Sequence, residues 1–239
     1  MKITMVGRLS DCLLLAYRTP LDAIAGLLPP GLSPVTHGGY AFWNVVACRV
    51  EKMRPAHIPR AFGMSYHHVA YRLYVRAATR GGEITGLYFL RSDADSSLIS
   101  AGGNLTSDFR FHGSQISLTT DAQTFSTRVT SKDASGDADI LATLANEARL
   151  AADSCFASIE EANHLLKYQP FGLSVHNKVL HVAEVLRDES CWRESAVTVG
   201  PSQFSYLDSL HQHNLRLERA TRVDAIDYRW RLGRKELLL

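Results

Sequence analysis

The sequence is poor in lysine and has no closely spaced cysteines. Only six of its 26 basic residues are lysines. Its four cysteines, Cys12, Cys48, Cys155 and Cys191, are far apart and form no CxxC pair. Dispersed cysteines are typical of a reducing compartment, where thiols stay free and pack as small hydrophobic groups. We therefore expect a cytoplasmic protein.

Long hydrophobic runs and a strong charge of one sign are also missing. No apolar run approaches the roughly 18 residues of a membrane-spanning helix, and Arg8 and Asp11 interrupt the apolar core that a signal peptide needs. The net charge is only +2, and the basic residues near the C-terminus are mixed with acidic ones. A nucleic-acid-binding arm has a cleaner basic block. We expect neither a membrane nor a nucleic-acid partner.

The common signatures of catalysis and metal binding are absent as well. The sequence has no G-x-S-x-G, no P-loop, no dinucleotide-binding fingerprint and no HExxH. Two histidine pairs, His67-His68 and His211-x-His213, are the nearest approach to a metal site. Neither has a cysteine, aspartate or glutamate at a convincing spacing for zinc. The sequence predicts no metal site and indicates no cofactor.

What is present is a succession of short apolar or alternating segments that are typical of strands. We expect strands at 12–18, 40–50, 65–76, 83–91, 102–113, 114–119, 124–130, 171–175, 179–186, 196–199 and 223–232. No repeat, low-complexity tract or linker divides the 239 residues. The prediction is one α+β domain, 1–239, that is mainly antiparallel and contains enough strands to close into a cone or barrel.

A few peripheral helices are expected between these strands. Thr19 as N-cap and Pro20 at the first helical position predict a helix that Pro29-Pro30-Gly31 ends. A helical pattern follows Gly136 and continues to about residue 151. Residues 93–101 are interpreted as a short helix or turn. Ser158 with Glu161 three residues later is a capping box that predicts one more helix.

One segment, 102–113, has the composition of a ligand-facing wall. In an extended strand, alternate side chains share a face. Leu105, Phe109 and Phe111 would then anchor the segment from behind. The opposite face would carry an amide, a hydroxyl, a carboxylate, a guanidinium and an imidazole, from Asn104, Thr106, Asp108, Arg110 and His112. The solvated face of an ordinary antiparallel sheet alternates in the same way, so both interpretations stay open here.

Several motifs together resemble one superfamily. They are Tyr17-Arg18-Thr19-Pro20-Leu21-Asp22-Ala23, Leu28-Pro29-Pro30-Gly31-Leu32, the segment 86–96, Leu165-Leu166-Lys167-Tyr168-Gln169-Pro170 and Gly200-Pro201. In this order they resemble the acetoacetate decarboxylase superfamily, and within it the uncharacterised YqjF-like branch, a domain of unknown function. The resemblance implies a large antiparallel sheet wrapped into a cone, with helices outside, a small-molecule cavity within, and possible self-association into a homo-oligomer.

The catalytic residues of the decarboxylases do not carry over. Their Schiff-base lysine follows a segment that Gly102-Gly103-Asn104-Leu105 resembles, and counting forward places Arg110 at its position. A family glutamate falls at Asn44, and a family arginine falls near Ser10, with Arg8 two residues away. Arginine stays protonated and cannot form an imine. The comparison implies that this chain is not an acetoacetate decarboxylase, and it leaves open whether it is an enzyme.

The leading hypothesis is a cavity that binds a small anionic ligand such as a carboxylate or keto acid. Arg110 would clamp the anionic group, with Asp108 as its ion-pair partner. The other candidate ligand-binding residues are Asn44, Asn104 and Arg8. Catalytic residues are not assigned; His112 and His67 are the candidates, because imidazole transfers protons near neutral pH.

Three alternatives remain. The first is a non-catalytic small-molecule binding or sensing protein on the same fold. The second is a Schiff-base enzyme that uses a relocated lysine, Lys167 or Lys178. A relocated lysine would also need groups that depress its pKa. The third is a purely structural interaction protein with an empty or collapsed cavity.

Overall fold

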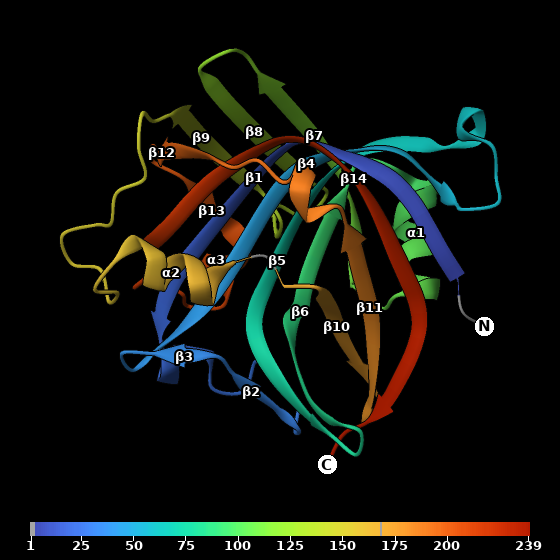
Figure 1. Ribbon diagram of the computed structural model, residues 1–239, viewed down its shortest axis with the longest axis horizontal. Helices are drawn as coiled ribbons and strands as arrows, with labels where there is room; N and C mark the ends of the chain where they lie inside the picture. The colour runs from blue at the N-terminus through green and yellow to red at the C-terminus, as the bar shows by residue number, and fades with distance from the viewer. Residues whose placement is uncertain (1–2, 168) are drawn as a thin grey trace.

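Long strands dominate the computed structural model, which describes residues 3–167 and 169–239 (Figure 1). The long strands are β1 (Ile3–Pro20), β4 (Tyr40–Pro55), β5 (Met64–Thr79), β6 (Gly82–Ala94) and β14 (Arg216–Leu237). The shorter ones are β2 (Leu32–Pro34), β3 (Thr36–His37), β7 (Phe111–Thr120), β8 (Thr124–Ser131), β9 (Ala138–Leu144), β10 (Phe171–His176), β11 (Val179–Arg187), β12 (Ser195–Val199) and β13 (Gln203–Phe204).

The helices are few and short. They are α1 (Ser97–Thr106), α2 (Ile159–Leu166) and α3 (Ser205–Ser209), with 3-10 turns at Leu21–Ile24, Arg60–Phe62 and Glu189–Cys191. Helix α1 lies on one side of the molecule, near the first strand, and α2 lies on the other (Figure 1). None of the helices among the described residues is long and apolar enough to cross a membrane.

The five long strands form a continuous antiparallel run in the order β14-β1-β4-β5-β6. Two further groups of strands connect the ends of this run. In the first, β10 pairs parallel with β6 and antiparallel with β11, which returns to β14. In the second, β7, β8, β9 and β12 lead from β6 back to β14. The sheet therefore curls into two rings, which give it a cone-like shape.

Because the rings share the long strands, the inner parts of β1, β4, β5 and β6 are buried on both faces, whereas β14 has exposed positions along much of its length. In β5, Val69 and Tyr71 pack in the larger hydrophobic core, whereas Tyr66 and Ala70 belong to a second core. The larger core also includes residues of β7, β8 and β9. Strands buried on both faces carry nearly continuous apolar sequence. This explains the apolar runs of β1, β4 and β5, which were predicted as strands.

Two bulges determine which side chains face the second core. In β1, Asp11 and Cys12 together oppose Cys48 of β4, and Asp11 has a positive φ of 47°. In β4 the register shifts near Lys52, whose φ is 52°. A bulge inserts one residue and reverses the alternation of side chains. As a result Leu9 and Cys12, three residues apart, both line the same cavity.

Most predicted segments are confirmed. Every predicted strand except 102–113 lies within a strand of the structure, and 65–76 and 83–91 form the expected hairpin across Gly81 and Gly82. The capping box is also confirmed. The backbone N–H of Glu161 donates to the Ser158 hydroxyl at 3.2 Å, at the start of α2.

The prediction of an extended strand over 102–113 is wrong. Residues up to Thr106 belong to α1, whose N-cap is Ser96, and β7 begins only at Phe111. Gly103 packs so closely on the Phe111 ring that a Cβ atom there would lie 2.5 Å from it. This tertiary contact holds a helix together across two glycines, in spite of their low helix propensity. The predicted row of polar side chains does not form.

Two helix predictions also need correction. Residues 138–144 form strand β9, because Ala138, Ile140 and Ala142 are buried at a period of two between β8 and β12. The segment after Thr19 forms only a 3-10 turn, Leu21–Ile24. Thr19 lies within β1 instead of capping a helix, and its hydroxyl donates to Gln212 Oε1 at 2.9 Å.

Candidate functional site

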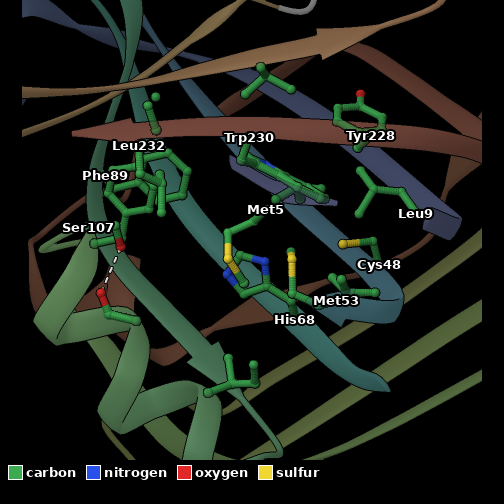
Figure 2. A pocket seen from close by; sticks show the side chains of 18 of the residues that line it. Met5, Leu9, Cys48, Met53, His68, Phe89, Ser107, Tyr228, Trp230 and Leu232 are labelled. Carbon is green, nitrogen blue, oxygen red and sulfur yellow. Dashed lines mark hydrogen bonds between the residues drawn. The ribbon is translucent and has the colours of Figure 1, made fainter. Parts of the chain in front are cut away.

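A cavity of about 390 Å³ lies inside the ring that contains β10 and β11. All seven strands of this ring supply lining residues, and α1 contributes Leu98, Ile99, Gly102 and Gly103. The wall is mainly apolar. Figure 2 shows Tyr228, Trp230 and Leu232 of β14 on one side, with Met53 and His68 on the other. The volume is that of a pocket for a small organic molecule.

Helix α1 is fixed to this ring at its C-terminal end. The Ser107 hydroxyl donates to the backbone carbonyl of Gly103 at 2.8 Å. The Ser174 hydroxyl of β10 donates in turn to the Ser107 carbonyl at 2.7 Å. These two bonds satisfy carbonyl groups at the helix end. They hold α1 against the ring as one side of the cavity.

Arg72 of β5 is the one arginine among the described residues that line this cavity. Its side chain is buried, with only 6% of the residue exposed. One Nη donates to Asn44 Oδ1, and the guanidinium lies 5.3 Å from the centroid of the Phe89 ring. Within the described part of the chain, Nε has no hydrogen-bond partner and no carboxylate forms an ion pair with Arg72. A buried charge without a counter-ion is costly.

Asn44 of β4 supports this guanidinium from behind. Its Nδ2 donates to the Tyr74 hydroxyl at 2.8 Å, and that hydroxyl donates to the Leu166 carbonyl at 2.8 Å. The chain of bonds leaves Oδ1 of Asn44 directed at Arg72. Asn44 was predicted to contact the ligand. The structure places it next to the cavity's arginine, as a residue that orients it.

A thiol pair and an imidazole lie further along the same wall. Cys48 pairs in register with His68 of β5, and the bulge in β1 places Cys12 opposite Cys48. The neighbouring Cys12 thiol, together with nearby His68 and Arg72, lowers the pKa of Cys48 to about 5 against the opposing effect of burial. The interaction with Cys48, together with burial, raises the pKa of Cys12. Figure 2 shows Cys48 and His68 beside Met53.

His68 itself is held by stacking. Its ring lies 5.4 Å from that of Phe111, at an interplanar angle of 24°. The Nε2 atom is buried and has no hydrogen-bond partner among the described residues. An imidazole nitrogen of this kind is available to a ligand or to a proton.

The residues predicted from the sequence lie mostly elsewhere. Arg110 is exposed, and its Nη2 donates to the Tyr88 hydroxyl at 3.1 Å. Asp108 was predicted to pair with it. No ion pair joins the two in the described structure, and Asp108 Oδ2 lies 3.8 Å from His176 Nδ1 instead. Asn104 bonds to the backbone of Phe111 through both its amide nitrogen and its oxygen.

Only Asn104 and Asp108 are brought together, in a separate hollow of about 410 Å³. Arg8 lies in another hollow, where its Nη1 is 3.7 Å from Asp227 Oδ1. His67 Nδ1 is 2.7 Å from Asp95 Oδ2. His112 is largely exposed, and its pKa is lowered by desolvation and by Arg91. None of these five residues is among those that line the cavity of the β10–β11 ring.

The lysines that the structure describes also lie outside the cavity. None of the lining residues that the structure describes is a lysine, and both Lys167 and Lys178 are exposed. No group of three or more histidine, cysteine, aspartate or glutamate side chains in the described ranges is placed to hold a metal ion.

The sequence analysis missed Arg72, Cys12 and Cys48, because the sequence marks them only weakly. Arg72 stands between Tyr71 and Leu73 in an otherwise apolar run, as Asn44 does in its strand. A charged residue in a strand that is buried on both faces needs a partner or a function. Cys12 and Cys48 were interpreted as small hydrophobic groups, because nothing in their spacing shows that they meet.

Solved structures with this architecture are acetoacetate decarboxylases and related enzymes. The acetoacetate decarboxylase of Legionella pneumophila is 14% identical with a TM-score of 0.63, over 98% of this chain and 87% of that chain. An acetoacetate decarboxylase-like enzyme of Sphingomonas wittichii is 15% identical with a TM-score of 0.62, over 98% and 92%. The enduracididine biosynthesis enzyme MppR, complexed with pyruvate, is 12% identical with a TM-score of 0.63, over 100% and 91%. The fold is therefore acetoacetate decarboxylase-like.

The sequence itself matches the family DUF2071, described as an uncharacterized conserved protein, over residues 7–168. The chain belongs to this family. A comparison with curated proteins finds no match. The resemblance that the sequence motifs suggested is confirmed at the level of the fold.

Proposed function

We propose that this protein binds a small molecule with an apolar body and one anionic group in the cavity of the β10–β11 ring. The observation that supports this proposal most strongly is the state of Arg72. Its guanidinium is buried, its Nε–H has no hydrogen-bond partner and it has no carboxylate partner in the described structure. An anionic ligand would supply the missing counter-charge. A guanidinium binds carboxylates through parallel hydrogen bonds.

The surroundings of Arg72 suit this role. Asn44 fixes one Nη, so less side-chain freedom is lost when the ligand binds. The apolar wall excludes water, which strengthens a charge-assisted hydrogen bond. The remaining volume accommodates hydrocarbon or an aromatic ring beside Phe89 and Trp230. The structure of the similar MppR with pyruvate makes 2-oxo acids the first ligands to test.

Any chemistry in this cavity is proposed to be independent of lysine, because no described lining residue is a lysine. His68 is then the group that can move a proton, since its Nε2 faces no other partner. The second candidate function is a non-catalytic binding or sensing protein. The mainly apolar wall favours it, because few polar groups are present to act on a ligand.

Calorimetric titration tests the binding site. The panel consists of 2-oxo acids and simple carboxylates with side chains of increasing length. We expect Arg72→Met to weaken binding by about 100-fold, as for the loss of one buried charge-assisted contact. Arg110→Ala should leave affinity unchanged. Arg76→Met is the matched control, because Arg76 is an exposed arginine on the same strand. Loss of binding in Arg110→Ala with full binding in Arg72→Met would overturn the assignment and restore Arg110.

Two further measurements separate the remaining functions. Consumption of a bound 2-oxo acid, followed by NMR, distinguishes an enzyme from a binding protein. Intact mass after incubation with acetoacetate or 2-oxo acids and cyanoborohydride tests imine chemistry, and we expect no adduct. A stable adduct on Lys167 or Lys178 would instead support a Schiff-base enzyme.

A further inference from the structure

Cys12 and Cys48 form the second unusual feature of the cavity. Both thiols are free, each residue is only 2% exposed, and both line the cavity. The bulge at Asp11 places Cys12 opposite Cys48 on the neighbouring strand, at a point where the register gives Cys12 no regular partner in β4. Regular pairs on adjacent antiparallel strands have Cα atoms about 4.5–5.5 Å apart. This lies within the range that a disulfide spans.

The surroundings of Cys48 favour a reactive thiolate. His68 is its cross-strand neighbour, with a buried and unpartnered Nε2, and Arg72 brings a permanent positive charge to the same wall. Thiolates beside cationic groups are the ones that react with electrophiles and oxidants. Because the adjacent Cys12 can attack an oxidised Cys48, the pair has the arrangement of a reacting thiol and a resolving thiol.

We propose that Cys12 and Cys48 are a reversible redox pair, oxidised to a disulfide by a hydroperoxide that enters the cavity. The thiolate of Cys48 attacks the terminal peroxide oxygen. An S–O bond forms, the O–O bond breaks, and the departing alkoxide takes a proton to become an alcohol. The product on Cys48 is a sulfenic acid.

In the second step Cys12 attacks the sulfur of this sulfenic acid. An S–S bond forms, the S–O bond breaks, and the hydroxide that leaves takes up the Cys12 proton as water. Overall, two thiols lose two electrons and two protons, and the hydroperoxide becomes an alcohol and water. A small thiol reductant reverses the change by disulfide exchange. The apolar wall favours an organic hydroperoxide over hydrogen peroxide. The proposal does not require an anionic ligand to bind at Arg72.

The test uses full-length protein carrying Cys191→Ser, which removes the exposed cysteine. Cumene hydroperoxide and hydrogen peroxide are the probes. Protein is then denatured, alkylated with N-ethylmaleimide and analysed by intact mass and peptide mapping. We expect the loss of two alkylatable thiols and a peptide that links Cys12 to Cys48, faster with cumene hydroperoxide and reversed by dithiothreitol.

Variants resolve the two steps. Cys12→Ser should stop at a sulfenic acid on Cys48, which dimedone traps, and Cys48→Ser should lose the rapid oxidation by at least about 10-fold. Circular dichroism checks that both variants fold. Rapid oxidation that persists in Cys48→Ser, or a linkage that excludes Cys12, would overturn the proposal. The peptide map of the parent protein decides the matter even if a variant fails to fold.

Discussion

Two buried arginines in neighbouring strands of this protein have opposite surroundings. Arg91 of β6 is 5% exposed and binds Asp93 through two hydrogen bonds, Nε to Oδ2 at 2.7 Å and Nη2 to Oδ1 at 2.8 Å. Arg72 of β5 is 6% exposed and has an amide oxygen as its only described side-chain hydrogen-bond acceptor. The fold neutralises the first charge, whereas no described carboxylate pairs with the second.

The packing also distinguishes the two arginines, because Arg91 is enclosed by protein whereas Arg72 faces a cavity. A Cβ atom at Gly136 would lie 2.1 Å from the Arg91 guanidinium, so the Arg91–Asp93 pair is fully enclosed. The Ser114 hydroxyl adds a bond of 2.7 Å to Asp93. Arg72 instead borders the cavity of about 390 Å³. A buried ion pair whose hydrogen bonds are satisfied specifies structure. A buried charge with no ion-pair partner, beside a cavity, is the feature on which the proposed ligand site rests.

The largest effect on stability is expected when Arg91 loses its carboxylate partner and so resembles Arg72. Asp93→Ala leaves Arg91 buried without its carboxylate, and removing one partner of a buried pair costs about 3–5 kcal/mol. Urea denaturation measures the free energy of unfolding. The double variant Arg91→Met/Asp93→Ala should recover part of the loss. A loss below about 1 kcal/mol in the single variant would show that the two surroundings do not differ as described.

The charge of Arg72 should also be visible in the chemistry of Cys48. Because the pKa of Cys48 is about 5, its thiolate persists above that pH and is lost as the pH falls through it. Alkylation by iodoacetamide, followed by peptide mass, should therefore change less than about 2-fold from pH 8 to pH 6. An ordinary thiol of pKa about 8.5 slows about 70-fold.

Variants apportion this effect among the groups that face Cys48, which are Cys12 of β1 and His68, Arg72 and Tyr66 of β5. The neighbouring Cys12 thiol is the largest cause, so Cys12→Ala should move the profile to higher pH more than Arg72→Met does. A wild-type rate that falls as steeply as that of an ordinary thiol contradicts the expectation.

A smaller effect on stability is expected when Arg72 is given a carboxylate partner. Asn44→Asp places an anion where Asn44 Oδ1 now accepts from Arg72, which resembles the pairing of Arg91. The charge-assisted bond is worth more than the bond from Asn44 Nδ2 to Tyr74 that is lost, for a net gain of about 1 kcal/mol. The variant should also bind anionic ligands at least about 10-fold more weakly. Scanning calorimetry measures the stability, and titration calorimetry measures the affinity for the ligand. Unchanged affinity would place the ligand elsewhere.

The smallest effect on stability is expected from removing the open charge. Arg72→Met deletes a buried cation that no described carboxylate compensates, which offsets the hydrogen bond lost at Asn44. The free energy of unfolding should therefore stay within about 1 kcal/mol of the wild type, as urea denaturation will show. A loss as large as that of Asp93→Ala would mean that Arg72 is structural after all.

The sequence was sufficient for most of the fold because each long strand is marked by local apolar pattern. It was insufficient for α1, whose two glycines become helical only where Gly103 meets the ring of Phe111. It was also insufficient for residues 138–144, because a short apolar segment satisfies both periods.

The candidate site depends on register, which counting along the chain does not show. The bulge at Asp11 brings Cys12 to Cys48, and the alignment of β4 with β5 brings Asn44 to Arg72. Arg110 was selected by counting forward from Gly102-Gly103-Asn104-Leu105 and by its place in a polar row. That row assumed extended backbone over a stretch that is partly helical.

The position of β14 has a consequence for the synthesis of the protein. This strand pairs with β1, β11 and β12 and closes both rings, and Ile3 has its partner at Leu232. On the ribosome, β1 therefore waits for almost the whole chain before its second edge is paired. Such long-range closure is slow, and an unpaired apolar edge is prone to aggregation. The nascent chain is exposed to this hazard until residues 216–237 emerge, and only then can the cavity be completed.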